Sequence, residues 1–229
     1  MDSRTSAPQK VALIAGASGL VGSQLLPLLL NCGRYAKVIS VGRRPLPLVH
    51  PLLVQRTVDF EHLEDHRLAL IADDVYCCLG TTMRQAGSRA AFYQVDYLYV
   101  VKLAALTAAN FAAQFMVVSA MGADASSAFY YNRVKGDMEA AVRQAPFRAI
   151  HIFRPSLLLG PRAEKRLGEQ VGAVLMRLVG PLLRGPLRRY RAVPAQAVAQ
   201  SMLNAAYQEG GGVRVYLSDE IAAGVSPTA

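Results

Sequence analysis

The sequence predicts an α/β fold: a doubly wound parallel sheet with a small C-terminal helical cap. Three observations favour this fold. Short apolar runs alternate with longer helical patterns along most of the 229 residues, which is typical of a parallel sheet covered by helices on both faces. A turn with three glycines joins the first apolar run to the first helical pattern. The composition, 52% hydrophobic and 18% charged, supports one large buried core and argues against disorder.

Strands are predicted where short apolar runs lie between polar or turn-forming residues. In chain order these runs are Val11 to Ala15, Val38 to Val41, Leu53 to Val58, Val75 to Leu79, Phe115 to Ser119 and Ala149 to Phe153, with Val213 to Leu217 as a last strand. All of them are short enough for strands of a buried sheet.

Helices are predicted between these strands, over Leu20 to Asn31, Ala86 to Asn110 and Tyr130 to Gln144, with a short helical turn near Glu61 to Asp65. After Pro155 the chain becomes rich in glycine, proline and arginine. An amphipathic helix is expected from about Gly168 to Leu183, and another from Pro194 to a residue before Gly210. We therefore expect residues 1–229 to form a single domain, in which residues 155–212 contribute the cap and the substrate side.

The glycine turn indicates what the fold binds. Gly16, Gly19 and Gly22 follow the first strand and precede the first helix. In a parallel sheet such glycines let backbone amides approach a phosphate at the N-terminus of the helix. No Gly-Lys-Ser/Thr sequence follows, so a nucleoside triphosphate site is disfavoured. The turn predicts a Rossmann-type dinucleotide site.

Residues after the second, third and fourth strands refine this prediction. Arg43 and Arg44 stand about 20 residues beyond the turn, where NAD-binding chains carry an acidic residue, and paired guanidiniums suit the 2′-phosphate of NADP. Asp59 and Phe60 are placed to meet the adenine. Gly80 allows the backbone to approach a ribose closely. NADP(H) is therefore the expected cofactor.

The catalytic candidates lie between Val117 and Val142. Ser119 ends a strand, and Tyr131 and Lys135 are four residues apart on a predicted helix, hence on one face. A tyrosine titrates near pH ~10, and a nearby ammonium stabilises its phenolate. These three residues predict an oxidoreductase in which Tyr131 protonates a carbonyl oxygen, Ser119 holds that oxygen, and Lys135 also contacts the nicotinamide ribose.

Taken together, these motifs resemble the short-chain dehydrogenase/reductase superfamily. The resemblance rests on the run from Gly16 to Gly22, Arg43-Arg44, Ser119, the Tyr131-x-x-x-Lys135 pair, and the Phe153-Arg154-Pro155-Ser156 segment. More narrowly, the chain is similar to the atypical, NADPH-binding, Tat-interacting-protein-like subgroup, whose bacterial members are often labelled nucleoside-diphosphate-sugar epimerases. The resemblance implies that the segment after Pro155 lies near the nicotinamide. It also identifies Asp96 as a departure, because many members have an asparagine there that supports a proton relay.

The motifs and the resemblance give one set of expected cofactor-binding residues: Gly16, Ser18, Gly19, Leu20, Val21, Gly22, Arg43, Arg44, Asp59, Phe60, Leu79, Gly80, Thr81, Tyr131, Lys135, Pro155, Ser156 and Leu157.

Two functions are compatible with these residues. The first is an NADPH-dependent oxidoreductase of a small carbonyl or alcohol, working through Ser119, Tyr131 and Lys135. The alternative is a non-catalytic NADPH-binding redox sensor that signals through a partner surface, because a fold shared with enzymes does not establish catalysis.

Charge and composition set the expected partners. The sequence from Arg154 to Arg191 contains nine Lys or Arg residues but only two acidic residues, Glu164 and Glu169. The basic region 162–191 is therefore a candidate surface for a protein partner. A homodimer is a further hypothesis, and nucleic-acid binding is disfavoured because this region lacks interleaved aromatic residues. Neither a membrane span nor a metal site is expected. The N-terminal sequence has no targeting pattern, which predicts a cytoplasmic protein.

Overall fold

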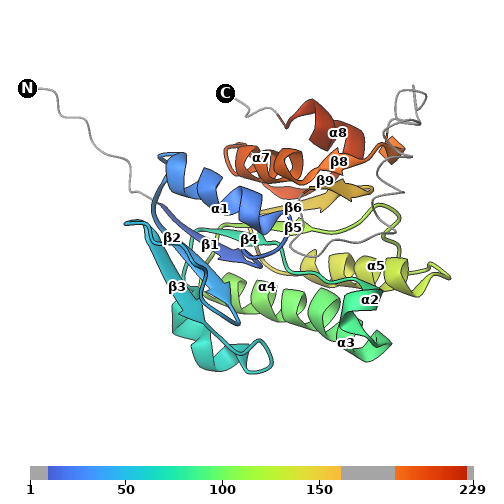
Figure 1. The fold of residues 1–229 in the computed structure, drawn as a ribbon, viewed down its shortest axis with the longest axis horizontal. Coiled ribbons are helices and arrows are strands. Elements are labelled where there is room, and N and C mark those ends of the chain that lie inside the picture. Colours follow the sequence, from blue (N-terminus) through green and yellow to red (C-terminus); the bar gives the residue numbers. More distant parts are fainter. Residues whose placement is uncertain (1–9, 161–188, 226–229) are drawn as a thin grey trace, which may run out of the picture.

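The fold is known from a computed structural model that describes residues 10–160 and 189–225. Its centre is a seven-stranded sheet in the order β3-β2-β1-β4-β5-β6-β9, and every neighbouring pair is parallel (Figure 1). The strands are β1 (Lys10–Ala15), β2 (Tyr35–Gly42), β3 (Leu53–Thr57), β4 (Asp74–Cys77), β5 (Gln114–Val118), β6 (Ala149–Arg154) and β9 (Gly212–Leu217). The short strands β7 (Leu158–Leu159) and β8 (Val193–Pro194) form a separate parallel pair. The predicted doubly wound α/β fold is confirmed.

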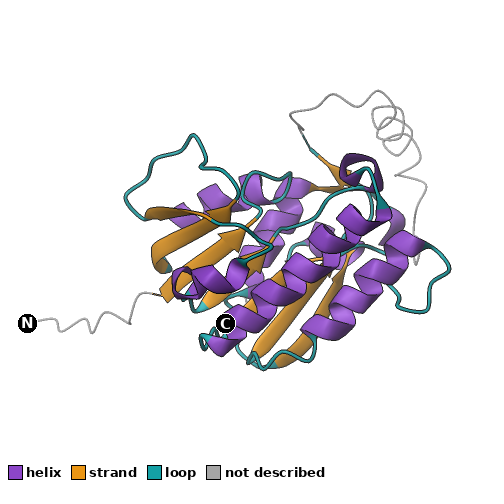
Figure 2. Cartoon of the chain, turned by 90° about the horizontal axis from the view of Figure 1, so that it is seen from below, coloured by secondary structure: helices purple, strands orange, loops and turns teal. Residues whose placement is uncertain are grey.

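Helices cover both faces of the sheet. One face carries α1 (Gly22–Asn31), α7 (Ala195–Ala205) and α8 (Ser218–Ala223), and the other carries α4 (Tyr99–Ala109) and α5 (Tyr130–Val142) (Figures 1 and 2). The short elements are η1 (Leu63–Leu70), α2 (Met83–Ala86), α3 (Arg89–Tyr93) and η2 (Gln94–Leu98). The strand order reverses at β1, which lies between β2 and β4: β2 and β3 extend the sheet to one side and β4, β5 and β6 to the other. Ligands bind at such a switch point in open α/β sheets.

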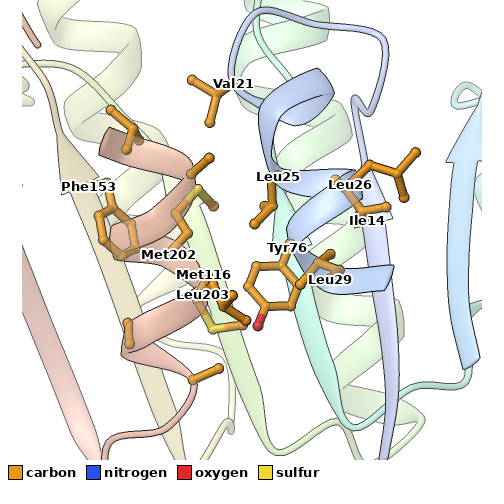
Figure 3. Close-up of a cluster of buried hydrophobic side chains, with 14 of the residues drawn as sticks. Ile14, Val21, Leu25, Leu26, Leu29, Tyr76, Met116, Phe153, Met202 and Leu203 are labelled. Carbon is orange, nitrogen blue, oxygen red and sulfur yellow. The ribbon is translucent and has the colours of Figure 1, made fainter. Parts of the chain in front are cut away.

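The sheet separates two hydrophobic clusters. Alternation along each strand sends neighbouring side chains to opposite faces: Ile14 and Tyr76 pack under α1 and α7, whereas Leu13 and Val75 pack under α4 and α5. Figure 3 shows the first cluster, in which leucines of α1 meet Met202 and Leu203 of α7 over the strands. Burial on both faces explains why the strands read as continuous apolar runs.

The segment expected as one helix from Ala86 to Asn110 is instead four elements. Gly87 has a φ of 74° and ends α2, and the hydroxyl of Ser88 accepts a hydrogen bond from the backbone N–H of Ala91 to start α3. A π-helical turn, η2, then precedes α4. The apolar periodicity identified the helical region, but a sequence period does not resolve a cap between two short helices.

Other boundaries moved by a few residues. Helix α1 starts at Gly22 rather than Leu20, because the glycine turn extends to Val21. Pro194 has an extended ψ of 138° and precedes α7 instead of starting it. Helix α8 was not predicted, and the helix expected from Gly168 to Leu183 lies outside the described residues.

Candidate active site

The glycine turn is shaped by close backbone packing. Gly16 has a φ of +83°, and a Cβ there would stand 2.5 Å from the carbonyl oxygen of Cys78. A Cβ on Gly22 would collide with the carbonyl oxygen of Gly16. Helix α1 starts at this turn without a side-chain cap, and Ser18 and Gly19 are exposed. An uncapped helix N-terminus behind an exposed glycine turn fits a dinucleotide phosphate.

The residues expected around the adenosine lie beyond β2 and β3. Arg43 and Arg44 are both exposed, directly after β2. The carboxylate of Asp59 accepts a hydrogen bond of 2.9 Å from the backbone N–H of Glu61. The ring of Phe60 is buried, 5.4 Å from that of Tyr99. Phe60 therefore contributes mainly to the core at this end of the sheet.

The loop after β4 is tied to the helical region beneath it. Leu79 is half-buried and Gly80 is exposed. The backbone N–H of Thr81 donates a hydrogen bond of 2.8 Å to the carboxylate of Asp96, which lies in η2. A Cβ on Gly80 would stand 3.3 Å from Asp96 Oδ1 and 3.9 Å from Lys135 Nζ. The expected ribose-binding backbone therefore lies directly over two charged side chains.

Helix α5 brings Tyr131 and Lys135 to this place. Gly136, on the same helix, packs against the backbone of residues 124–125 so closely that any Cβ would collide with it. This contact holds the loop after β5 against α5. The ring of Tyr131 lies 5.3 Å from that of Phe92, whereas the Tyr130 hydroxyl points elsewhere and donates to the carbonyl of Arg89 at 2.9 Å.

Lys135 is buried and paired with a carboxylate. Its Nζ lies 2.7 Å from Asp96 Oδ1, and both side chains are almost fully buried. Burial raises the pKa of Tyr131; the Lys135 ammonium opposes this rise, and Asp96 adds to it. The stabilisation of a Tyr131 phenolate by Lys135 is therefore outweighed, mainly by burial and in smaller part by the opposing charge of Asp96.

Ser119 is hydrogen-bonded to the buried carboxylate of a second ion pair. Its hydroxyl donates a hydrogen bond of 2.6 Å to Glu139 Oε1. Arg154 donates two hydrogen bonds to the same carboxylate, from Nε to Oε1 at 2.9 Å and from Nη2 to Oε2 at 2.7 Å. Nη2 of Arg143, the residue that follows α5, lies 3.6 Å from Oε2. The residue expected to hold a substrate oxygen is thus bonded to a buried carboxylate.

The segment after β6 is fixed to the C-terminal part of the chain. The carbonyl oxygen of Pro155 accepts a hydrogen bond of 2.9 Å from the N–H of Met121. The N–H of Ser156 donates to the hydroxyl of Ser218 at 2.7 Å, and the Ser156 hydroxyl donates to the carbonyl of Arg191. Leu157 is exposed. This expected nicotinamide-side segment ends next to the loop that follows Ser119.

The predicted site residues thus gather at the carboxyl edge of the sheet, and three further residues belong with them. Glu139 and Arg154 were not predicted to be site residues. Asp96 was noted only because many related proteins have an asparagine at this position. Glu139 follows Tyr131 by eight residues and Lys135 by four, so helical spacing alone places all three on one face of α5. That spacing was the available signal for Glu139.

Two further points concern the membrane and the metal. Among the residues that the structure describes, no helix combines the length and the apolarity needed to cross a bilayer. Within those same ranges no three His, Cys, Asp or Glu side chains gather in a way that would hold a metal ion.

Comparison with known proteins gives clear sequence relatives. The rat protein HTATIP2 is 39% identical over 207 residues, which cover 89% of this chain and 84% of that protein. Protein FMP52 of Candida glabrata is 31% identical over 168 residues, covering 70% and 69%. No family profile matches the chain.

The names of the fungal relatives contradict the predicted cytoplasmic location, because these proteins are named mitochondrial. That prediction was based on the absence of a targeting pattern in MDSRTSAPQK, and this absence did not exclude another compartment.

Solved structures with the same fold are more distant in sequence. MoeE5, in complex with UDP-glucose and NAD, has a TM-score of 0.66 at 17% identity, with 93% of this chain and 79% of that chain covered. The Bordetella bronchiseptica enzyme WbmH, in complex with NAD+, has a TM-score of 0.69 at 14% identity, with 91% and 76% covered. These likenesses support the NAD(P)-binding type of fold and leave the choice of cofactor to other arguments.

Proposed function

We propose, because this chain belongs to the HTATIP2 family of atypical short-chain dehydrogenase/reductase proteins, that it is an NADPH-dependent oxidoreductase of a small carbonyl compound or alcohol. One observation carries the proposal. Tyr131 and Lys135 lie one helical turn apart on α5. Lys135 Nζ lies close to Gly80, in the loop expected to meet the cofactor: a Cβ added to Gly80 would stand 3.9 Å from it. An acid and a cation beside a dinucleotide loop are the groups that carbonyl reduction requires.

The residues of this chain have separate tasks in that reaction. NADPH, when bound, supplies hydride to the carbonyl carbon. Tyr131 donates a proton to the carbonyl oxygen, and Lys135 moderates the charge that Tyr131 acquires. The hydroxyl of Ser119 can donate one hydrogen bond, and it donates this bond to Glu139. It can therefore donate to a substrate oxygen only after its hydrogen bond to Glu139 is broken. Residues 155–212 are proposed to contribute the substrate side of the same single domain.

The choice of NADPH over NADH rests on Arg43 and Arg44. Both side chains are exposed at the end of β2, and no acidic residue stands with them in Val41-Gly42-Arg43-Arg44. Two guanidiniums favour a 2′-phosphate, whereas a carboxylate there would favour a ribose hydroxyl. The exposed Ser18 and Gly19 in the turn before α1 support the pyrophosphate site of the same cofactor.

The test is NADPH oxidation measured with a panel of aldehydes, ketones and quinones. Tyr131→Phe should lower kcat by about 10²- to 10⁴-fold while NADPH still binds, because a general acid is lost. Tyr130→Phe is the matched control: it removes the neighbouring phenol, which bonds to the carbonyl of Arg89, and it should keep turnover. Full turnover by Tyr131→Phe would refute the proposed mechanism.

A second candidate function, a non-catalytic NADPH sensor, is favoured by one observation. The Ser119 hydroxyl is bonded to Glu139, and the Lys135 charge is neutralised by Asp96, so neither group is free for catalysis in this arrangement. A sensor predicts tight NADPH binding without turnover on any compound, and a partner affinity that changes with NADPH. Most of the basic region 162–191 that would serve as partner surface lies outside the described residues.

A further inference from the structure

Asp96 joins three parts of the candidate site. It is fully buried in the π-helical turn η2, a type of turn that is frequent at functional sites. Its Oδ2 accepts the backbone N–H of Thr81 at 2.8 Å, and its Oδ1 lies 2.7 Å from Lys135 Nζ. One carboxylate therefore fixes both the loop after β4 and the ammonium of α5.

Asp96 consequently offsets part of the effect of the Lys135 ammonium on Tyr131. Among the described residues, the charged groups that act on its phenol are Lys135, from its own helix, and Asp96, from η2. Phe92 of α3 packs against the ring and carries no charge. Cys77 of β4 lies near both members of the pair, and burial raises the pKa of its thiol to about 12, so it is neutral as well. Tyr131 thus stands beside a neutral pair instead of an isolated ammonium.

The ion pair itself is held in its charged form. Burial acts to lower the pKa of Lys135, but the charge of Asp96 raises it above its usual value. Both side chains are almost fully buried, and breaking one partner of such a pair is costly. The ammonium is therefore present, fixed in position and electrically balanced.

We propose that Asp96 is a positioning residue that fixes the Lys135 ammonium and offsets part of its charge, so that Tyr131 remains a protonated phenol, ready to donate its proton, to higher pH. This rests on the proposed function. In reduction the carbonyl carbon gains a hydride from NADPH, the electron pair of the C=O π bond moves to oxygen, and the oxygen takes the Tyr131 proton. The products are the alcohol, NADP+ and a Tyr131 phenolate, which recovers a proton from water. Oxidation is the same step in reverse and starts from the phenolate.

The test is a tyrosinate titration by ultraviolet absorbance on the full chain without cofactor. The chain has ten tyrosines, so each protein is compared with its own Tyr131→Phe counterpart, and the difference isolates Tyr131. In Asp96→Asn the ammonium is no longer balanced, and Tyr131 should titrate about one pH unit or more below its wild-type midpoint. The double variant Asp96→Asn/Lys135→Gln removes both charges and should titrate near the wild type.

Equal Tyr131 midpoints in Asp96→Asn and the wild type would overturn the proposal, and so would a double variant that follows Asp96→Asn. If Asp96→Asn fails to fold, Lys135→Gln is compared with the double variant. Lys135→Gln retains Asp96 and should titrate at higher pH, and equal midpoints would again overturn the proposal.

The titration needs no turnover, so its result is separate from the proposed function. Where turnover is found, Asp96→Asn should move the high-pH fall of kcat/KM for reduction to lower pH, because Tyr131 then loses its proton earlier, and Asp96→Glu should restore part of this shift. A protein without turnover on any carbonyl or alcohol would count against the oxidoreductase, while the Tyr131 midpoints would still decide the role of Asp96.

Discussion

Replacing Glu139 by glutamine tests whether the carboxylate organises the Ser119 side of the site. Glu139 is 2% exposed and accepts three hydrogen bonds from Ser119 and Arg154. An amide keeps one acceptor oxygen and turns an NH₂ group towards one of these donors. Breaking a buried ion pair costs about 3–5 kcal/mol. The Arg154 side chain is 27% exposed and water can reach it, so we expect a smaller loss, of about 2–3 kcal/mol.

This loss is measured as the change in unfolding free energy from urea denaturation, together with the melting temperature. For a chain of this size about 2–3 kcal/mol corresponds to a fall of roughly 4–12 °C. Asp137→Asn is the matched control, since it makes the same change two residues earlier on α5 at a partly exposed position, where an effect within about 0.5 kcal/mol is expected. If Glu139→Gln unfolds at the same urea concentration as Asp137→Asn, the carboxylate does not hold Ser119 and Arg154 as argued.

Two further predictions concern pH and cofactor choice. Burial, helped by the charges of Arg214 and Arg148, lowers the pKa of His151 to about 4. Between pH ~6.5, its ordinary pKa, and pH ~4 the unfolded chain binds a proton that the folded chain excludes, so the free energy of unfolding falls by about 3 kcal/mol as the pH is lowered across this window. His151→Gln should remove most of this slope in urea midpoints, and an unchanged slope would contradict the assignment. Arg43→Ala/Arg44→Ala should raise the Kd for NADPH at least about tenfold and leave that for NADH nearly unchanged; equal losses for both cofactors would exclude a 2′-phosphate contact.

The sequence predicted the fold well because local patterns determine it. Buried parallel strands are continuous apolar runs, so all seven strands of the main sheet were located within a few residues. The glycine turn was also readable, because Gly16 and Gly22 occupy places where any Cβ would collide with backbone. Helix caps at Gly87 and Ser88 were missed, since one continuous apolar period ran across them.

The candidate site was predicted only in part, for a physical reason. Tyr131 and Lys135 can be identified from their spacing on one helix. The charges that act on them come from residues far away in the sequence. Asp96 is 39 positions before Lys135 in the sequence, yet the two charges are 2.7 Å apart. Arg154 reaches Glu139 only because β6 runs beside α5. Spacing rules identify which groups are present, and tertiary packing decides which charges are cancelled.

That cancellation gives α5 two balanced pairs one helical turn apart, Lys135 with Asp96 and Glu139 with Arg154. A negative charge formed at Tyr131 is then offset only in part, because Asp96 opposes the attraction of Lys135. In a low-dielectric setting an uncompensated charge is costly, so a phenolate formed during reduction is driven to recover its proton. The same cost opposes the phenolate that alcohol oxidation needs at the outset. The pH at which Tyr131 gives up its proton is therefore governed by the partners of Lys135 and not by Lys135 alone.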